Sequence, residues 1–219
     1  KMWKPGTRAP GVQERANDES GDIVVVNKYK HLPLTTQRQK LPIYRNRSHI
    51  LYLLEHYRTL ILVGETGCGK TTQIPQYLRE AGWADGNRVI ACTQPRRVAV
   101  QNVSARVAEE MGVNLGEDVG YTIRFDDKSN SSRTRIKFLT DGILLREMMS
   151  DPLLSRYSVI MVDEAHERSL NTDVLLGLLK KVQKRRKELR VIVSSATLDA
   201  EGLRDFFLSG KPPPPPPPY

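Results

Sequence analysis

The residues best suited to chemistry form a glycine-rich stretch of eight residues that matches the pattern G-x-x-x-x-G-K-[ST]. Its members are Gly64, Glu65, Thr66, Gly67, Cys68, Gly69, Lys70 and Thr71. The apolar run TLILV (59–63) precedes it and the amphipathic stretch TTQIPQYLRE (71–80) follows, which is the strand, loop and helix context that the pattern requires. Glycines allow backbone N–H groups to surround a phosphate, and a helix N-terminus adds a positive dipole end. Pattern and context together predict a loop that binds the phosphates of a nucleotide.

Two side chains at the end of this loop have specific tasks. Lys70 can reach the β- and γ-phosphates, and the hydroxyl of Thr71 can ligate Mg²⁺. With the rest of the loop and with Thr72, they predict a site for ATP, or another NTP, together with Mg²⁺. A redox role for Cys68 is an alternative, but we interpret Cys68 as one of the many small residues that such a loop accepts.

A second candidate site, Val162-Asp163-Glu164-Ala165-His166, closes the apolar run YSVIMV (157–162). In open α/β sheets, ligands bind at the edge where the strands have their carboxyl ends. Asp163 is therefore placed to hold the Mg²⁺ of a bound nucleotide, and Glu164 to orient or deprotonate the attacking water. An acidic pair after a strand can also be a helix cap. Its combination with the phosphate loop favours the catalytic interpretation.

The order of the motifs resembles one protein family. By itself, His166 would be interpreted as a structural, hydrogen-bonding histidine. The order Asp-Glu-Ala-His, together with the phosphate loop, resembles the DEAH-box family of superfamily 2 RNA helicases. Three further motifs are present in the expected order: Thr93-Gln94-Pro95-Arg96-Arg97, Thr140-Asp141-Gly142 and Ser195-Ala196-Thr197. The resemblance extends from about Leu41 to Phe207 and implies the first RecA-like lobe of an ATP-dependent RNA helicase.

The resemblance implies that three residues couple nucleotide chemistry to motion. His166 would couple the state of the nucleotide to movement between lobes, and Ser195 and Thr197 would link hydrolysis to unwinding. The family continues with a second RecA-like lobe that carries arginine fingers, followed by winged-helix, ratchet and OB-like domains. The resemblance covers only the first lobe, and we therefore expect residues 1–219 to bind nucleotide without efficient hydrolysis or unwinding.

Arg106 matches the family's arginine that stacks on the nucleotide base. A guanidinium group stacks well on a π face. The sequence leaves open a second interpretation, in which Arg106 is a helix surface residue paired with Glu109 or Glu110 at helical spacing.

Three residues match family positions that hold the RNA sugar–phosphate backbone: Arg97, Arg124 and Thr140. Guanidinium groups pair with phosphate through two parallel hydrogen bonds, which agrees with this assignment. For the neighbouring Arg96, a surface salt bridge is supported at least as well as an RNA contact. The basic run KKVQKRRKELR (180–190) is interpreted as a solvated helix face rather than a nucleic-acid patch.

Short apolar runs alternate with longer amphipathic stretches and predict the elements that position these residues. The predicted strands are TLILV (59–63), RVIAC (88–92), VGYTI (119–123), IKFL (136–139), YSVIMV (157–162) and LRVIVS (189–194). This alternation favours an α/β fold with a mostly parallel sheet between helices. We predict one RecA-like domain over residues 41–210, with a helix in RNRSHILYLLEHY (45–57) and a polar loop over 126–133.

The two ends of the chain have other compositions. Residues 1–40 are rich in Gly, Pro, Asn, Gln and charge, and predict an extended, partly disordered arm. Residues 211–219, KPPPPPPPY, predict a polyproline II tail. Such a tail suits aromatic-lined grooves, so an alternative function is a catalytically silent module that recruits partners through it.

Composition limits the classes of binding partner and the cellular compartments that are expected for this protein. The chain has 34 Lys and Arg against 25 Asp and Glu, a formal net charge of +9, which favours a polyanion such as RNA. No apolar run is long enough to span a membrane. Two cysteines are too few for a disulfide scaffold, so a reducing compartment, nucleus or cytosol, is expected.

The resemblance adds spliceosomal proteins or a G-patch-type activator as partners, and favours the nucleus and pre-mRNA splicing. A P-loop ATPase acting on DNA or protein is the alternative among enzymes.

Overall fold

The structure, a computed structural model, describes residues 14–17, 23–25, 31–196 and 200–208. The chain divides into two compact units, Lys1–Leu41 and Pro42–Tyr219. In the first unit, β1 (Glu14–Asn17) pairs antiparallel with β2 (Ile23–Val25), and helix α1 (Leu34–Lys40) follows. The predicted extended arm did not include these elements, because segments this short show no clear hydrophobic period.

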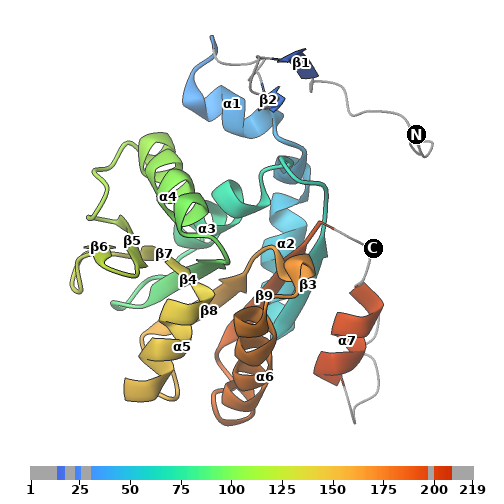
Figure 1. Cartoon of the computed structure of the whole chain (residues 1–219), viewed down its shortest axis with the longest axis vertical. Helices are drawn as coiled ribbons and strands as arrows, with labels where there is room; N and C mark the ends of the chain where they lie inside the picture. The colour runs from blue at the N-terminus through green and yellow to red at the C-terminus, as the bar shows by residue number, and fades with distance from the viewer. Residues whose placement is uncertain (1–13, 18–22, 26–30, 197–199, 209–219) are drawn as a thin grey trace. The chain divides into compact units, whose positions relative to one another are not determined.

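A seven-stranded sheet organises the second unit, with the strand order β3-β9-β8-β4-β7-β5-β6 (Figure 1). Its strands are β3 (Thr59–Val63), β4 (Val89–Gln94), β5 (Val119–Ile123), β6 (Asp126–Lys128), β7 (Ile136–Thr140), β8 (Tyr157–Val162) and β9 (Arg190–Ser195). Neighbouring strands pair parallel except β5 and β6, which pair antiparallel. The prediction of an α/β P-loop fold with a mostly parallel sheet is confirmed.

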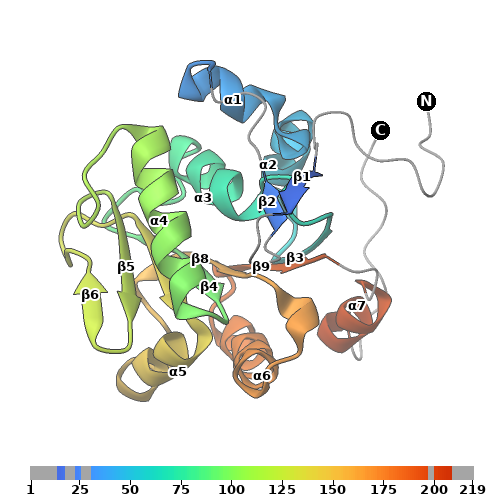
Figure 2. The same ribbon diagram turned by 45° about the horizontal axis from the view of Figure 1, so that its top comes forward.

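Helices cover both faces of this sheet. They are α2 (Arg47–His56), α3 (Lys70–Glu80), α4 (Arg97–Met111), α5 (Asp141–Ser150), α6 (Leu170–Arg185) and α7 (Ala200–Leu208), with the short 3₁₀ helices η1 (Pro42–Asn46) and η2 (Ala165–Glu167). Figure 2 shows α3 and α4 on one face and α5 and α6 on the other. Both faces of the central strands are thus removed from water, which explains their nearly continuous apolar sequences.

The core lies around the two central strands, β4 and β8, which are buried along their whole length. On one side of them, Leu139, Leu144, Leu175 and Leu179 pack into a single apolar cluster. Burying one such side chain contributes about 1.5–3 kcal/mol, so the strands are held firmly in register. The residues that follow the carboxyl ends of β3, β4, β7, β8 and β9 therefore meet at one edge with little freedom.

The structure corrects the predicted polar loop over 126–133. Asp126–Lys128 forms the edge strand β6, and the hydroxyl of Tyr121 donates a hydrogen bond of 2.6 Å to Asp126 Oδ2. Polar side chains suit an edge strand, because one side of its backbone has no partner strand. The polyproline tail lies outside the described residues. Among the described helices, none is long and apolar enough to cross a membrane.

Candidate functional site

The phosphate loop connects the end of β3 to the start of α3 at Lys70. Gly67 and Gly69 have φ angles of +82° and +97°, which glycine adopts at no steric cost. The N–H of Gly64 donates to the carbonyl of Ser195 at 3.1 Å, so the loop begins against the end of β9. The backbone turns here in the way that the glycine pattern predicts.

Lys70 is the first residue of α3, and it is only 5% exposed. Its ammonium group donates to the carbonyls of Gly64 and Glu65, the latter at 2.9 Å, and lies 3.7 Å from Cys68 Sγ. The charge is thus held within the curve of the loop rather than in solvent. Phosphate oxygens are stronger partners for an ammonium group than neutral carbonyls are, so a nucleotide can replace these contacts.

Asp163 connects the phosphate loop to the acidic motif. It directly follows β8, is fully buried, and accepts a hydrogen bond from the hydroxyl of Thr71. The amide of Gln94, the last residue of β4, donates to the same carboxylate oxygen at 2.6 Å. The sequence analysis did not single out Gln94. Its position at the end of a strand, inside the Thr93–Arg97 motif, is the feature by which the sequence could have identified it as a site residue.

The pair formed by Thr71 and Asp163 fits a Mg²⁺ ion. A hydroxyl oxygen and a carboxylate oxygen in direct contact are the hard ligands that this ion accepts. Among the described residues no cluster of three or more His, Cys, Asp or Glu side chains could hold a metal. The pair therefore fits an ion whose other ligands are phosphate oxygens and water, as in nucleotide sites.

Glu164 occupies a special backbone position beside this pair. Its φ is +53°, in the left-handed region, and its side chain is 25% exposed. Burial, followed by the nearby charge of Asp163, raises the pKa of Glu164 above its ordinary value. A carboxylate with a raised pKa accepts a proton more readily, which is what a general base requires.

His166 bridges the acidic motif and the end of β9. Its Nδ1 accepts a hydrogen bond of 3.2 Å from the backbone N–H of Ala196, and its Nε2 lies 3.4 Å from Glu164 Oε2. Because Nδ1 is the acceptor, a neutral ring carries its proton on Nε2, which faces the glutamate. The structure thus brings His166 to the Ser195–Ala196 segment, while Thr197 lies outside the described residues. Their coupling roles stay predictions.

Arg106 makes the salt bridges that the sequence left open as an alternative. Its Nε donates to Glu110 Oε1 at 2.7 Å and its Nη1 to Glu109 Oε2 at 3.1 Å. Glu110, whose side chain is 4% exposed, also accepts from the amides of Gln73 and Gln76 on α3, each at 2.8 Å. Glu110 therefore ties the phosphate-loop helix to α4, a role that helical spacing alone did not reveal. The base contact of Arg106 stays a prediction.

The three predicted RNA contacts lie at the same edge of the sheet. Arg97 begins α4 just after β4, Arg124 directly follows β5, and Thr140 ends β7. These three strands are parallel neighbours, so their carboxyl ends lie side by side. Both arginines are exposed, and the Arg124 guanidinium carbon lies 4.8 Å from the ring centroid of Phe125, which is 90% exposed.

Two other arginine predictions have clear outcomes. Arg96 donates to Glu167 at 3.0 Å, which is the surface salt bridge that the sequence analysis considered. In the basic run 180–190, Arg186 is only 9% exposed and donates to three backbone carbonyls, while Arg190 donates to the carbonyl of Leu54 at 2.6 Å. The solvated-face interpretation was therefore wrong for these two residues, because their guanidinium groups satisfy buried carbonyls.

Comparison with known proteins gives one family model and several close relatives. The model described as an AAA domain matches residues 54–203. The "Probable ATP-dependent RNA helicase DHX35" of Homo sapiens is 62% identical over 212 residues, which is 94% of this chain and 30% of the relative. The protein of that name from Pongo abelii is also 62% identical over 212 residues, covering 94% of this chain and 29% of the relative. A Caenorhabditis elegans homolog is 64% identical over 181 residues, 83% of this chain and 25% of the relative. The chain thus spans less than a third of the length of these relatives.

Proposed function

Because this chain belongs to the DEAH-box family of RNA helicases and contains its P-loop nucleotide-binding domain, we propose that it is the first motor lobe of an enzyme that hydrolyses NTP to remodel or move along RNA. One observation carries the proposal. Lys70 and Thr71 begin α3, and Asp163 and Glu164 follow β8, so the two pairs are far apart in the sequence. The hydrogen bond from Thr71 to Asp163 nevertheless joins them at one edge of the sheet, beside the phosphate loop.

The side chains divide the work of hydrolysis. Backbone N–H groups of the loop and Lys70 hold the phosphates, and Thr71 and Asp163 would hold Mg²⁺, which supplies neutralising charge. Glu164 orients the attacking water and accepts its proton, and the raised pKa of Glu164 favours that transfer. The N–H of Glu164 donates to Asp163 Oδ1 at 2.9 Å, which fixes the two carboxylates relative to each other. His166 links Glu164 to the backbone of Ala196 at the end of β9, so a change at the phosphates can be transmitted to the Ser195–Ala196 segment.

The proposal also covers the biological setting. RNA is the proposed polymer substrate. The proposed pathway is pre-mRNA splicing in the nucleus, and the proposed partners are spliceosomal proteins or a G-patch-type activator. The net charge of +9 and the two exposed arginines at the ligand edge support RNA. The relatives are named as RNA helicases, which supports the same polymer.

Replacing Glu164 with glutamine is expected to separate nucleotide binding from chemistry. The amide can still hydrogen-bond a water molecule but cannot accept its proton, so Mg-nucleotide affinity should persist while turnover of the complete enzyme falls by about 10² or more. Only the ionised glutamate acts as base, so its raised pKa should place the acid limb of the wild-type rate profile at a higher pH than an ordinary glutamate would. Steady-state phosphate release measured over a range of pH tests the turnover and its acid limb, and titration with nucleotide tests the affinity. Equal loss of affinity and turnover would move Glu164 to a structural role.

Charge reversal at Arg97 or Arg124 is expected to weaken RNA binding similarly for all sequences. Phosphate contacts carry no sequence information, and each lost contact should reduce the slope of log affinity against log salt by about 0.7 for a single strand. Fluorescence anisotropy with two single strands of different sequence, over a series of salt concentrations, measures this. Arg133→Glu is a matched control, because Arg133 is exposed but pairs with Glu117, away from this edge. A loss confined to one sequence would contradict the backbone assignment.

A further inference from the structure

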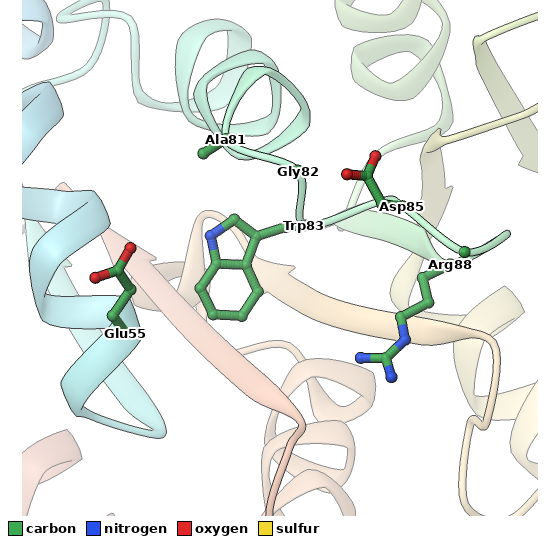
Figure 3. A pocket seen from close by; sticks show the side chains of 7 residues that line it. Glu55, Ala81, Gly82, Trp83, Asp85 and Arg88 are labelled. Atoms are coloured by element: carbon green, nitrogen blue, oxygen red, sulfur yellow. The ribbon is translucent and has the colours of Figure 1, made fainter.

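Helix α3 has a cavity near its carboxyl end and the phosphate loop at its amino end. The cavity, of about 530 Å³, is lined by the last turn of α2 and by the loop that joins α3 to β4 (Figure 3). The protein's own Arg190 serves this region: its guanidinium carbon lies 5.7 Å from the centroid of the Trp83 ring, and its Nε donates to the carbonyl of Leu54. The polar network that bears on nucleotide binding lies instead at the amino end of α3.

This network is centred on Glu110, a carboxylate of α4 whose side chain is 4% exposed. Its Oε1 accepts from Arg106, and its Oε2 accepts from the side-chain amides of Gln73 and Gln76. Both glutamines belong to α3 and are fully buried. A carboxylate paired with a guanidinium group only accepts hydrogen bonds, so each glutamine must present its NH₂ group to it. Glu110 therefore fixes the direction in which both amides point.

Gln73 passes this direction on to Thr72, in the first turn of α3. Of the two hydrogens on the Gln73 amide nitrogen, one is donated to Glu110 Oε2 at 2.8 Å and the other to Thr72 Oγ1 at 3.0 Å. Thr72 Oγ1 is thus an acceptor on this side, and its own hydrogen must point elsewhere. That hydrogen is donated to the carbonyl of Gly69, in the phosphate loop. The chain of contacts from Glu110 to Thr72 therefore aims a hydroxyl hydrogen at the phosphate loop.

The contact between Thr72 and Gly69 is one that a phosphate can replace. Its length of 3.3 Å exceeds the usual range of about 2.5–3.0 Å for a bond between two oxygens. The carbonyl of Gly69 also accepts already from the backbone N–H of Gln73, at 2.9 Å. Among the described residues, no side chain caps α3 at Gly69, so the N–H groups of the first turn are directed at the same space. A phosphate oxygen there is a stronger acceptor for the Thr72 hydroxyl than the carbonyl is.

We propose that Glu110 is a positioning residue for nucleotide binding, which acts through Gln73 to keep the Thr72 hydroxyl turned toward the phosphates as a donor. This inference rests on the proposed function, because it takes the phosphate loop as a nucleotide site. Without the carboxylate, Gln73 can rotate its amide and present its oxygen to Thr72. The hydroxyl would then donate to that oxygen and turn away from the phosphates. A purely structural tie between α3 and α4 would not depend on this direction.

The test measures the affinity of the 219-residue chain for Mg-ATP and for Mg-tripolyphosphate, which has neither base nor sugar, by nuclear magnetic resonance titration. Glu110→Gln and Thr72→Val are each expected to weaken binding of both ligands roughly tenfold, the loss expected for one hydrogen bond to a charged group. The double variant should match Thr72→Val within about twofold, because valine has no hydroxyl left to orient. Glu109→Gln is the matched control: it removes another carboxylate partner of Arg106 and should leave tripolyphosphate affinity unchanged.

A second variant separates the direction of the hydrogen bonds from the tie itself. Exchanging the two groups, Gln73→Glu with Glu110→Gln, restores a pair of one carboxylate and one amide between α3 and α4. The direction is reversed, because a carboxylate at position 73 can only accept from Thr72. Thermal unfolding should therefore show a more stable protein than Glu110→Gln alone, while the affinity for both ligands should stay low.

Four results would overturn the inference: unchanged affinity in Glu110→Gln, a loss confined to Mg-ATP, an equal loss with and without the Thr72 hydroxyl, or wild-type affinity in the exchanged pair. The last two would leave Glu110 as a structural tie only. A wild-type chain that binds neither ligand would refute the proposed function and this inference with it. Wild-type binding with unaltered variants would refute the role of Glu110 alone.

Discussion

A polypeptide of residues 1–219 is expected to bind Mg-nucleotide weakly and to release phosphate at or near the background rate. It has the phosphate loop, the Thr71–Asp163 pair that we propose holds Mg²⁺, and Glu164, which we propose orients the attacking water. The family resemblance assigns the arginines that neutralise the transferring phosphoryl group to a second lobe. Such arginines contribute about 10³–10⁵ in rate where they act. Binding should therefore survive in this polypeptide, while efficient catalysis and duplex unwinding should not.

Steady-state phosphate release by residues 1–219, with RNA in excess, measures this expectation. Glu164→Gln in the same polypeptide is the control that excludes contaminating ATPases. Adding the second lobe covalently should restore RNA-stimulated hydrolysis, because a linker supplies the effective concentration that weakly associating lobes need. If the 219-residue chain turned over at roughly 1 s⁻¹ or faster while the control did not, hydrolysis would not require the second lobe.

Lys70→Ala is expected to abolish Mg-nucleotide binding. Lys70 is 5% exposed and its ammonium group lies inside the loop, so alanine removes the charge at the position where we propose that the phosphates bind. The backbone N–H groups of the loop supply only partial charges and cannot replace it. Isothermal titration with ATP at moderate salt, with and without Mg²⁺, measures the loss.

Two controls separate loss of the site from loss of the fold. Lys187→Ala removes an exposed lysine elsewhere on the same domain and should leave nucleotide affinity unchanged. Thermal unfolding of Lys70→Ala checks the loop itself, because the wild-type ammonium group also holds the carbonyls of Gly64 and Glu65. Wild-type affinity in a folded Lys70→Ala protein would refute the site assignment.

The sequence alone predicted the elements that depend on local order. The glycine pattern predicted the turn at Gly67 and Gly69, because a positive φ is inexpensive only for glycine. An apolar run bounded by polar residues predicted β8, because a strand buried on both faces must be apolar throughout. The acidic motif was placed correctly after β8 because both are encoded within a few neighbouring residues.

The tertiary structure decided which of these elements meet. No local sequence pattern predicts the order of the strands in the sheet. This order places β9 beside β3 and therefore brings the carbonyl of Ser195 to the N–H of Gly64. It also brings β4 beside β8, so that the amide of Gln94 reaches the carboxylate of Asp163.

The tertiary structure also determined the partners of charged residues whose roles the sequence interpretation missed or assigned wrongly. Glu110 became the tie between α3 and α4, and Arg186 and Arg190 became donors to carbonyls far along the chain, because the packing of helices on the sheet buried their surroundings. A polar group removed from water needs a partner, and only the assembled fold determines which partner lies within reach.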